Sequence, residues 1–396
     1  MPPDNPPPRS LVWAMVLQYA AGGAVYPFIT LLLRDRGFTV GEISLVLLSG
    51  SAALLVSPFF WGMLADRFVP LNRLFGIMNG LALVALIAFW PQTRLPGVLL
   101  TLTAFFACYQ PAPMLVNALS FRHLADPLEQ FAALRAWGSF GWVLPSLPVF
   151  LWLAARPGAD FEFVVWLSAG LCLAMMAVSF ALPHTPPGAT HKTEPGTTRL
   201  GYWAGLRLLL RNPSYLVVLG SFLLVSASFA IQAYYSPPRL EDLGMARAWI
   251  GPAQSIGVIW EILLFRWRSI IVNRLGYSGS VLIGCLALVA RQLLFAYADN
   301  LWVLAASYLL VGTTVVLYHI GVSLLVEAIA GQEVKSTAQT LLVLCSSGVG
   351  PMFANVAVGR LAPGNHPDLS GVFLFAAALA ALATLLILMR GRKLVP

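Results

Sequence analysis

The stretch GMLADRF, residues 62–68, ends one long apolar segment and leads into the next. Residues 41–65 and 72–91 on either side are each long enough to cross a bilayer, whose hydrocarbon core takes about 20 residues of helix. Ten more segments of this kind occupy residues 11–33, 96–120, 133–155, 161–182, 214–236, 248–272, 277–297, 301–326, 335–360 and 370–390. The sequence therefore predicts an all-α membrane protein with twelve transmembrane helices.

Composition and charge exclude several other classes. The chain is 59% hydrophobic and only 10% charged, which a soluble protein of this length would not be. The net charge of +8 is spread over several loops and does not indicate a nucleic-acid-binding patch. The four cysteines lie inside predicted helices at spacings that suggest neither a metal site nor disulfides, so we expect no metal and no cofactor.

The N-terminal sequence and the distribution of basic residues predict how the chain is placed in the membrane. The N-terminus lacks the basic start and the cleavage site of a signal peptide, so the first apolar segment is expected to stay as a spanning helix. Most of the 24 Lys and Arg residues lie on one side if both termini are cytoplasmic. We expect a monomer in the lipid bilayer of a bacterial cytoplasmic (inner) membrane.

The chain divides into two similar parts. Residues 183–213 are rich in Pro, Gly, Thr and basic residues and predict a cytoplasmic linker between an N-terminal half (1–182) and a C-terminal half (214–396). A shift of 207 residues aligns Asp35 with Asp242 and Gly50 with Gly257. This repeat indicates duplication of a six-helix unit, with a ligand site expected near mid-membrane between the halves.

GMLADRF resembles the signature between the second and third helices of the major facilitator superfamily. The resemblance implies that Gly62 permits close helix approach and that Asp66 and Arg67 form part of a gating charge cluster at the cytoplasmic face. The second glycine of the signature is missing, because Val69-Pro70 follows Phe68. Together with the helices, linker and repeat, the motif predicts a major facilitator fold of two six-helix halves.

Two charges lie deep inside predicted helices. Counting at about 1.5 Å per residue from the loop between their helices places Glu261 roughly 18 Å and Arg291 roughly 21 Å above it. At matching height on adjacent helices they could form an ion pair, and breaking that pair would raise the pKa of the carboxyl. Glu261 could then act as a proton carrier, or the two residues could form a static structural ion pair.

His319 is the third candidate for proton coupling. It is predicted in mid-helix, where an imidazole could join a proton path, and an interior histidine held by hydrogen bonds is an equal alternative.

The second half resembles a narrower branch of the superfamily, the nucleoside:proton symporters related to the lactose permease group. The run WEILLFRWRSIIVNRLGYSGSVLIGCLALVARQLLFAYAD carries Glu261, Arg274, Gly276 and Arg291 at the family's spacing, and KSTAQTLL (335–342) and LPHTPP (182–187) are also similar. In the first half, YQPAPMLVNALSF (109–121) and RAWGSFGW (135–142) resemble its fourth and fifth helices.

The resemblance implies a set of substrate contacts. In the wider branch an Arg at the position of Arg135 bonds sugar hydroxyls and a Trp at the position of Trp142 stacks on the ring, while Asn117 stands where sugar permeases carry an acid. The family's amide one turn before the acid is replaced here by Val258, and Gln254 could substitute for it. Trp142 could instead serve packing. The expected substrate contacts are Asn117, Arg135, Ser139, Trp142, Gln232, Gln254, Glu261 and Tyr318.

These observations predict a secondary active transporter that takes up a small polar ring-containing solute, by resemblance a nucleoside, together with protons. The transport alternatives are proton-driven efflux of amphipathic compounds and uptake of a sugar or an aromatic acid. A membrane sensor is the alternative outside transport. No phosphate-binding loop or nucleophile motif suggests an enzyme.

Overall fold

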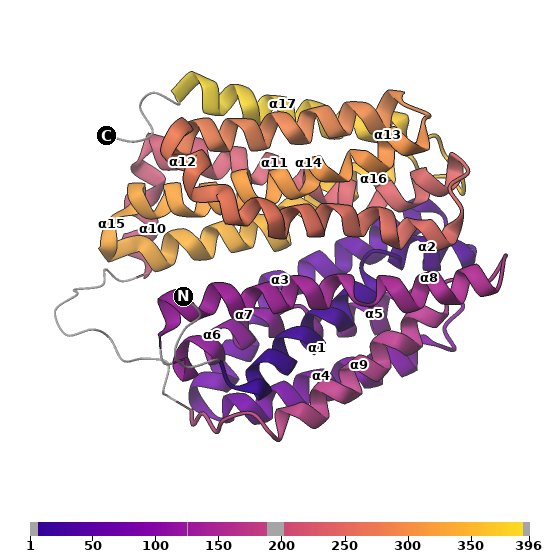
Figure 1. Cartoon of the computed structure of the whole chain (residues 1–396), viewed down its shortest axis with the longest axis horizontal. Helices are drawn as coiled ribbons and strands as arrows, with labels where there is room; N and C mark the ends of the chain where they lie inside the picture. Colours follow the sequence, from indigo (N-terminus) through magenta and orange to yellow (C-terminus); the bar gives the residue numbers. More distant parts are fainter. Residues whose placement is uncertain (1–6, 125, 188–201, 391–396) are drawn as a thin grey trace. The chain divides into compact units, whose positions relative to one another are not determined.

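The computed structural model describes residues 7–124, 126–187 and 202–390, and its regular elements there are all helices (Figure 1). Within these residues, 11 helices are long and apolar enough to cross a membrane, and the apolar helix Phe163–Ser179 is shorter. Their bounds follow the predicted segments closely; for example, Ala133–Ala155 and Leu301–Val326 reproduce predicted ranges. The predicted all-α membrane class is confirmed.

The described residues up to 187 form nine helices, and three membrane spans are each divided into two of them. Breaks between α1 and α2, α5 and α6, and α7 and α8 occur at prolines, which remove a backbone donor and clash with the preceding turn. The helices are α1 (Arg9–Val25), α2 (Ile29–Asp35), α3 (Val40–Arg67), α4 (Leu71–Phe89), α5 (Leu95–Tyr109), α6 (Ala112–His123), α7 (Pro127–Val143), α8 (Ser146–Ala155) and α9 (Phe163–Ser179).

The later part contains one very long element and two π-helical turns. The long element, α12, is two helices joined at Gly276, whose φ of 69° only glycine adopts readily. The elements are α10 (Tyr202–Arg211), α11 (Pro213–Asp242), α12 (Arg247–Tyr297), α13 (Leu301–Ala306), α14 (Tyr308–Thr313), η1 (Thr314–His319), α15 (Ile320–Val343), η2 (Leu344–Val349), α16 (Gly350–Leu361) and α17 (Ser370–Arg390).

By internal contacts the chain divides into two compact units. The first comprises Met1–Phe38, Ser49–Lys192 and Arg247–Pro252, and the second comprises Thr39–Leu48, Thr193–Ala246 and Ala253–Pro396. Each unit thus contains a short segment from the other part of the sequence. A shift of 207 residues carries Val40 onto Arg247, the first residues of α3 and α12, so these two segments correspond and support the internal repeat.

Each unit has its own apolar core. In the first, α1 packs against α7 and α9, and buried side chains such as Phe75, Met78 and Val116 fill the interior. In the second, α11 packs against α15, α16 and α17, with Val218, Val322 and Ala380 among the buried residues. Small and branched side chains let helices pack closely where lipid supplies no hydrophobic drive between them.

The predicted linker is partly helical. Residues 188–201 lie outside the described residues, but α10 follows them and packs against α11 and α15. Leu209 of α10 is buried in the second unit's core, whereas Leu208 and Leu210 are exposed. The end of the segment predicted as a linker therefore forms a short helix with one buried face. The boundaries predicted for the two halves stay a prediction.

Candidate functional site

In the first unit, two of the predicted substrate residues lie on α7, against Tyr19 of α1 and against Tyr26, which directly follows α1. The guanidinium carbon of Arg135 stands 4.4 Å from the centre of the Tyr19 ring. The indole of Trp142 stacks on Tyr26, with 6.0 Å between ring centres and 19° between planes. All four side chains are half-buried. An arginine over an aromatic face is held by cation–π attraction.

Close contact between the two backbones makes these side-chain pairs possible. A Cβ on Gly23 of α1 would collide with the backbone carbonyl of Trp142, and one on Gly141 of α7 would collide with that of Val16. Glycine at both positions brings the helix axes together, as small residues do in membrane helix pairs.

The other first-unit candidates, Asn117 and Ser139, are both half-buried. The Oδ1 atom of Asn117 on α6 and the Nη1 atom of Arg135 on α7 are buried and have no hydrogen-bond partner among the described residues. One is an acceptor and the other a donor, which is the pairing that a hydroxyl group can satisfy.

In the second unit, Glu261 lies where α12 packs tightly against α14. A Cβ on Gly312 would stand 2.8 Å from the backbone nitrogen of Glu261, and the indole of Trp260 donates to the hydroxyl of Thr313 at 3.0 Å. Glu261 itself is half-buried. The helix pair thus fixes a carboxylate-bearing residue at the level of Gly312.

Arg291, on the later part of α12, is completely buried. Its Nη1 donates to the hydroxyl of Ser307 at 2.5 Å, and its guanidinium carbon lies 3.9 Å from the ring centre of Tyr308 and 4.4 Å from that of Phe295. The Nε and Nη2 atoms have no partner among the described residues. A charge buried this way is costly, because desolvation is not repaid by a counter-charge.

The predicted ion pair between Glu261 and Arg291 is not formed. Arg291 contacts the start of α14 at Ser307 and Tyr308, whereas Glu261 lies beside Gly312. Four to five residues of helix separate these levels, roughly 6 to 7 Å. Counting from the loop fixed the approximate height of each charge but not this offset. Their role in proton coupling stays a prediction.

His319 and Tyr318 lie in the π-helical turn η1, a rare form that is frequent at functional sites. The His319 ring packs edge-on against the rings of Phe222, Phe229 and Tyr318 at 5.6, 4.9 and 5.6 Å, and its buried Nδ1 has no hydrogen-bond partner within the described part. Tyr318 is fully buried and its hydroxyl lies 3.0 Å from that of Ser221. Direct substrate contact by Tyr318 would require that pair to open.

The two predicted glutamines differ in environment. Gln232, on α11, is buried, and its Oε1 atom lacks a partner among the described residues. Gln254, on α12, is half-buried. Each could present an amide to a ligand, and their roles stay predictions.

The gating motif lies at the end of α3. Nothing in the described residues comes within 4 Å of the position that a Cβ on Gly62 would take, so the close approach implied by the resemblance is not seen there. Asp66 is half-buried and Arg67 exposed.

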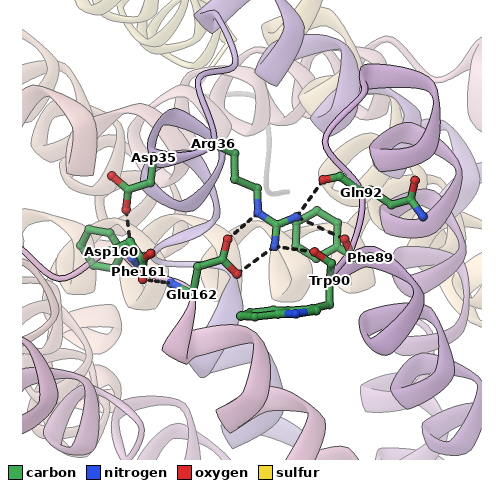
Figure 2. A network of polar contacts seen from close by, with 8 residues as sticks. All are labelled: Asp35, Arg36, Phe89, Trp90, Gln92, Asp160, Phe161 and Glu162. Carbon is green, nitrogen blue, oxygen red and sulfur yellow. Dashed lines mark hydrogen bonds and ion pairs between the residues drawn. The ribbon is translucent and has the colours of Figure 1, made fainter.

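A polar network surrounds Arg36, which lies between α2 and α3 at the other end of α3 from the gating motif (Figure 2). Its Nε and Nη2 atoms donate to the two carboxylate oxygens of Glu162 at 2.6 and 2.8 Å. Its remaining N–H groups donate to the backbone carbonyls of Phe89, Trp90 and Gln92 at 3.1 to 3.3 Å. Arg36 thereby satisfies carbonyls at the C-terminal end of α4 and pairs with the residue before α9.

Asp35, the neighbour of Arg36, bonds elsewhere. It accepts from the backbone N–H of Phe161 at 2.9 Å and from Nη2 of Arg247 at 2.7 Å. Arg247 is the first residue of α12 and belongs to the same compact unit.

Sequence reasoning missed the aromatic partners Tyr19, Tyr26, Phe222 and Phe229. A signal for the first two was available: Tyr19 and Tyr26 are seven residues apart, as are Arg135 and Trp142, and each helix carries glycines between them.

Comparison with known proteins decides the family. A sequence model described as "Nucleoside H+ symporter" matches residues 9–393. The chain belongs to the nucleoside H+ symporter family. Members of this family are transporters, so the prediction of a transporter and not an enzyme is confirmed, as is proton-coupled nucleoside uptake at the level of the family.

Individual relatives agree with that placement. A putative nucleoside transporter of Escherichia coli (strain K12), YegT, is 24% identical over 405 residues, covering 97% of this chain and 93% of that protein. The nucleoside permease NupG of the same organism is 22% identical over 353 residues, covering 85% and 82%.

The crystal structure of the nucleoside transporter NupG superposes on this chain with a TM-score of 0.84 at 20% identity, covering 97% of this chain and 99% of that one. The predicted major facilitator fold is therefore confirmed.

Proposed function

We propose that this symporter imports nucleosides with protons across a bacterial inner membrane by alternating access, as a monomer with both termini in the cytoplasm. Asn117 and Arg135 bond the polar edges of the solute and Trp142 stacks on its base, with Ser139 beside them on α7. Within the second unit, Gln232 and Gln254 offer amides and Glu261 carries the proton.

The proposed coupling mechanism rests on one observation, the environment of Arg291. Arg291 is fully buried, and two of its guanidinium nitrogens have no hydrogen-bond partner among the described residues. The half-buried Glu261 lies beside Gly312, about 6 to 7 Å of helix from the contacts of Arg291 at Ser307 and Tyr308. Buried ionisable groups in membrane segments persist mainly where they serve transport. When Glu261 is protonated it needs no counter-charge, and Arg291 keeps its hydrogen bond to Ser307. When Glu261 loses its proton, the carboxylate attracts the guanidinium of Arg291. His319 is a second proton acceptor in this scheme.

The experiment measures nucleoside movement in proteoliposomes with and without an imposed pH gradient. Glu261→Gln mimics the protonated acid, so concentrative uptake should be lost while exchange of labelled for unlabelled nucleoside continues. Asp299→Asn, which removes an exposed carboxylate of the same unit, is the matched control and should behave as wild type. Concentrative uptake by Glu261→Gln would overturn the carrier role.

Direction is tested separately. Right-side-out membrane vesicles energised with a proton gradient should accumulate labelled uridine. Export of uridine under the same gradient would overturn import.

A further inference from the structure

Helices α1 and α7 carry two matched contacts, each between a tyrosine and a residue of the proposed substrate site. Tyr19 lies under Arg135, and Tyr26 lies against Trp142. Tyr19 lies on α1, and Tyr26, seven positions later, is the residue that caps the end of α1; their partners are seven residues apart on α7. Seven residues are about two helical turns, so each pair of side chains shares one face of its helix.

The backbone between the two contacts holds them in register. Gly22 and Gly23 on α1 face Trp142 so closely that a Cβ on either would meet its side chain or backbone. On α7, a Cβ on Gly138 would stand 2.9 Å from the Tyr19 ring. Rotation of either helix would therefore displace both ring contacts together.

The contacts orient the groups that the solute needs. The Tyr19 ring holds the guanidinium carbon of Arg135 at 4.4 Å from its centre, and the buried Nη1 of Arg135 is without a partner in the described residues. Tyr26 is the ring that stacks on Trp142, and it covers one face of the indole. The opposite face is the one that a planar base would use.

We propose that Tyr19 and Tyr26 are positioning residues of the nucleoside site, which act by fixing the plane of Arg135 and the tilt of Trp142. The inference rests on the proposed function and adds two residues to it. Because both act through a flat ring and not through a hydroxyl, phenylalanine should replace either one and leucine should not.

The test compares KM and maximal rate for labelled uridine uptake by the full-length protein in proteoliposomes, normalised to correctly folded protein. Tyr19→Leu should raise KM about 5-fold, the size expected for loss of a cation–π contact, and Tyr19→Phe should stay within about 2-fold of wild type. Tyr26→Leu should likewise raise KM about 3- to 10-fold, with Tyr26→Phe close to wild type.

Trp152 provides a matched control in the same unit. Its ring stacks on Phe163 at 4.6 Å and lies 3.6 Å from the guanidinium carbon of Arg156, so Trp152→Leu removes the same two kinds of contact away from α1. This variant should lose some thermal stability and keep the wild-type KM. A purely structural role for the tyrosines would give the same result in their leucine variants and would overturn the proposal.

A double-mutant cycle tests action through Arg135. In an Arg135→Lys background, Tyr19→Leu should raise KM no further, because the planar group that the ring orients is already gone. Additive effects would overturn the proposal. A wild-type protein that moved no nucleoside would instead overturn the proposed function, so the two failures are distinguishable.

Discussion

Arg36 and Arg291 are both withdrawn from water, yet their guanidinium groups are partnered in opposite ways. Arg36 has 10% of its side chain exposed and donates all five of its N–H groups to a carboxylate and three carbonyls. Arg291 is wholly buried, has one hydrogen bond to a neutral hydroxyl, and leaves two nitrogens unpartnered among the described residues.

The difference separates a stabilising arginine from one kept for function. A paired and fully bonded arginine ties three chain segments together and has nothing left to offer a ligand. A buried arginine without a counter-charge lowers stability in the state that shows it. It is retained at that cost when a second state supplies the missing partner, which here would be the deprotonated Glu261.

The largest expected effect comes from Arg291→Gln. Removing the buried charge should reduce proton-driven accumulation of nucleoside to the equilibrium level, because the carboxylate loses its partner after proton release. The melting temperature should stay the same or rise, since the uncompensated charge is gone. Uptake against a gradient and thermal unfolding of the purified protein check the two parts. A marked fall in stability would place Arg291 with Arg36 among structural arginines.

Arg36→Gln should show the reverse pattern. It leaves the Glu162 carboxylate and the carbonyls at the end of α4 without their donor, so we expect a loss of about 3 kcal/mol in the free energy of unfolding. Protein that still folds should transport with unchanged KM. Arg156→Gln, which removes an exposed arginine that contacts the Trp152 ring, is the comparison variant and should lose less stability. An altered KM in folded Arg36→Gln would break the distinction between the two arginines.

The sequence predicted what the bilayer dictates. Spanning helices need long apolar segments, so most of their ends followed from hydropathy to within a few residues. The breaks inside them at prolines were not predicted. The Glu261 and Arg291 pair failed because counting residues gives height along a helix but not which neighbour a side chain meets. The partners of Arg291 are Tyr308, the first residue of α14, and Ser307, which precedes it.

The first-unit residues show the same limit. Arg135 and Trp142 were predicted by resemblance, whereas Tyr19 and Tyr26 were missed because aromatic residues in a first spanning helix usually serve packing. Glycines on α1 and α7 let the two helices pack closely, and this packing brings Tyr19 against Arg135 and Tyr26 against Trp142. The equal spacing of seven residues in each segment did not by itself reveal that the two segments pack together.

Ser307→Ala sharpens the description of Arg291 itself. It removes the one hydroxyl that the guanidinium contacts, so the charge becomes still less compensated and the free energy of unfolding should fall by about 1.5 kcal/mol. In the double variant with Arg291→Gln, that loss should largely disappear. Ser280→Ala, which removes a hydroxyl that donates to the backbone carbonyl of Gly276, is the control for loss of a buried serine and should give the same loss in both backgrounds. Equal losses from Ser307→Ala in both backgrounds would show that Ser307 does not stabilise the charge.

The smallest effect belongs to Arg239, an arginine whose carboxylate partners lie in water. Its guanidinium is 3.3 Å from Asp368, which is 71% exposed. The pKa of Asp368 is lowered, first by the backbone N–H of Ser370, then by the Ser370 hydroxyl, and less by Arg239. A lowered pKa means that the ionised carboxyl stabilises the folded chain above its ordinary pKa of 3.8, and that this contribution is lost as the pH falls through the lowered value.

Because solvent screens an exposed pair, Asp368→Asn should cost at most about 0.5 kcal/mol at pH 7. The amide keeps an oxygen that can accept from Ser370, so the variant isolates the charge. Melting temperatures of the two proteins should converge as the pH is lowered. A difference in melting temperature that persists at low pH would mean that geometry, not charge, accounts for it. A loss of stability at neutral pH as large as that of Arg36→Gln would show that solvent exposure does not set the strength of these ion pairs.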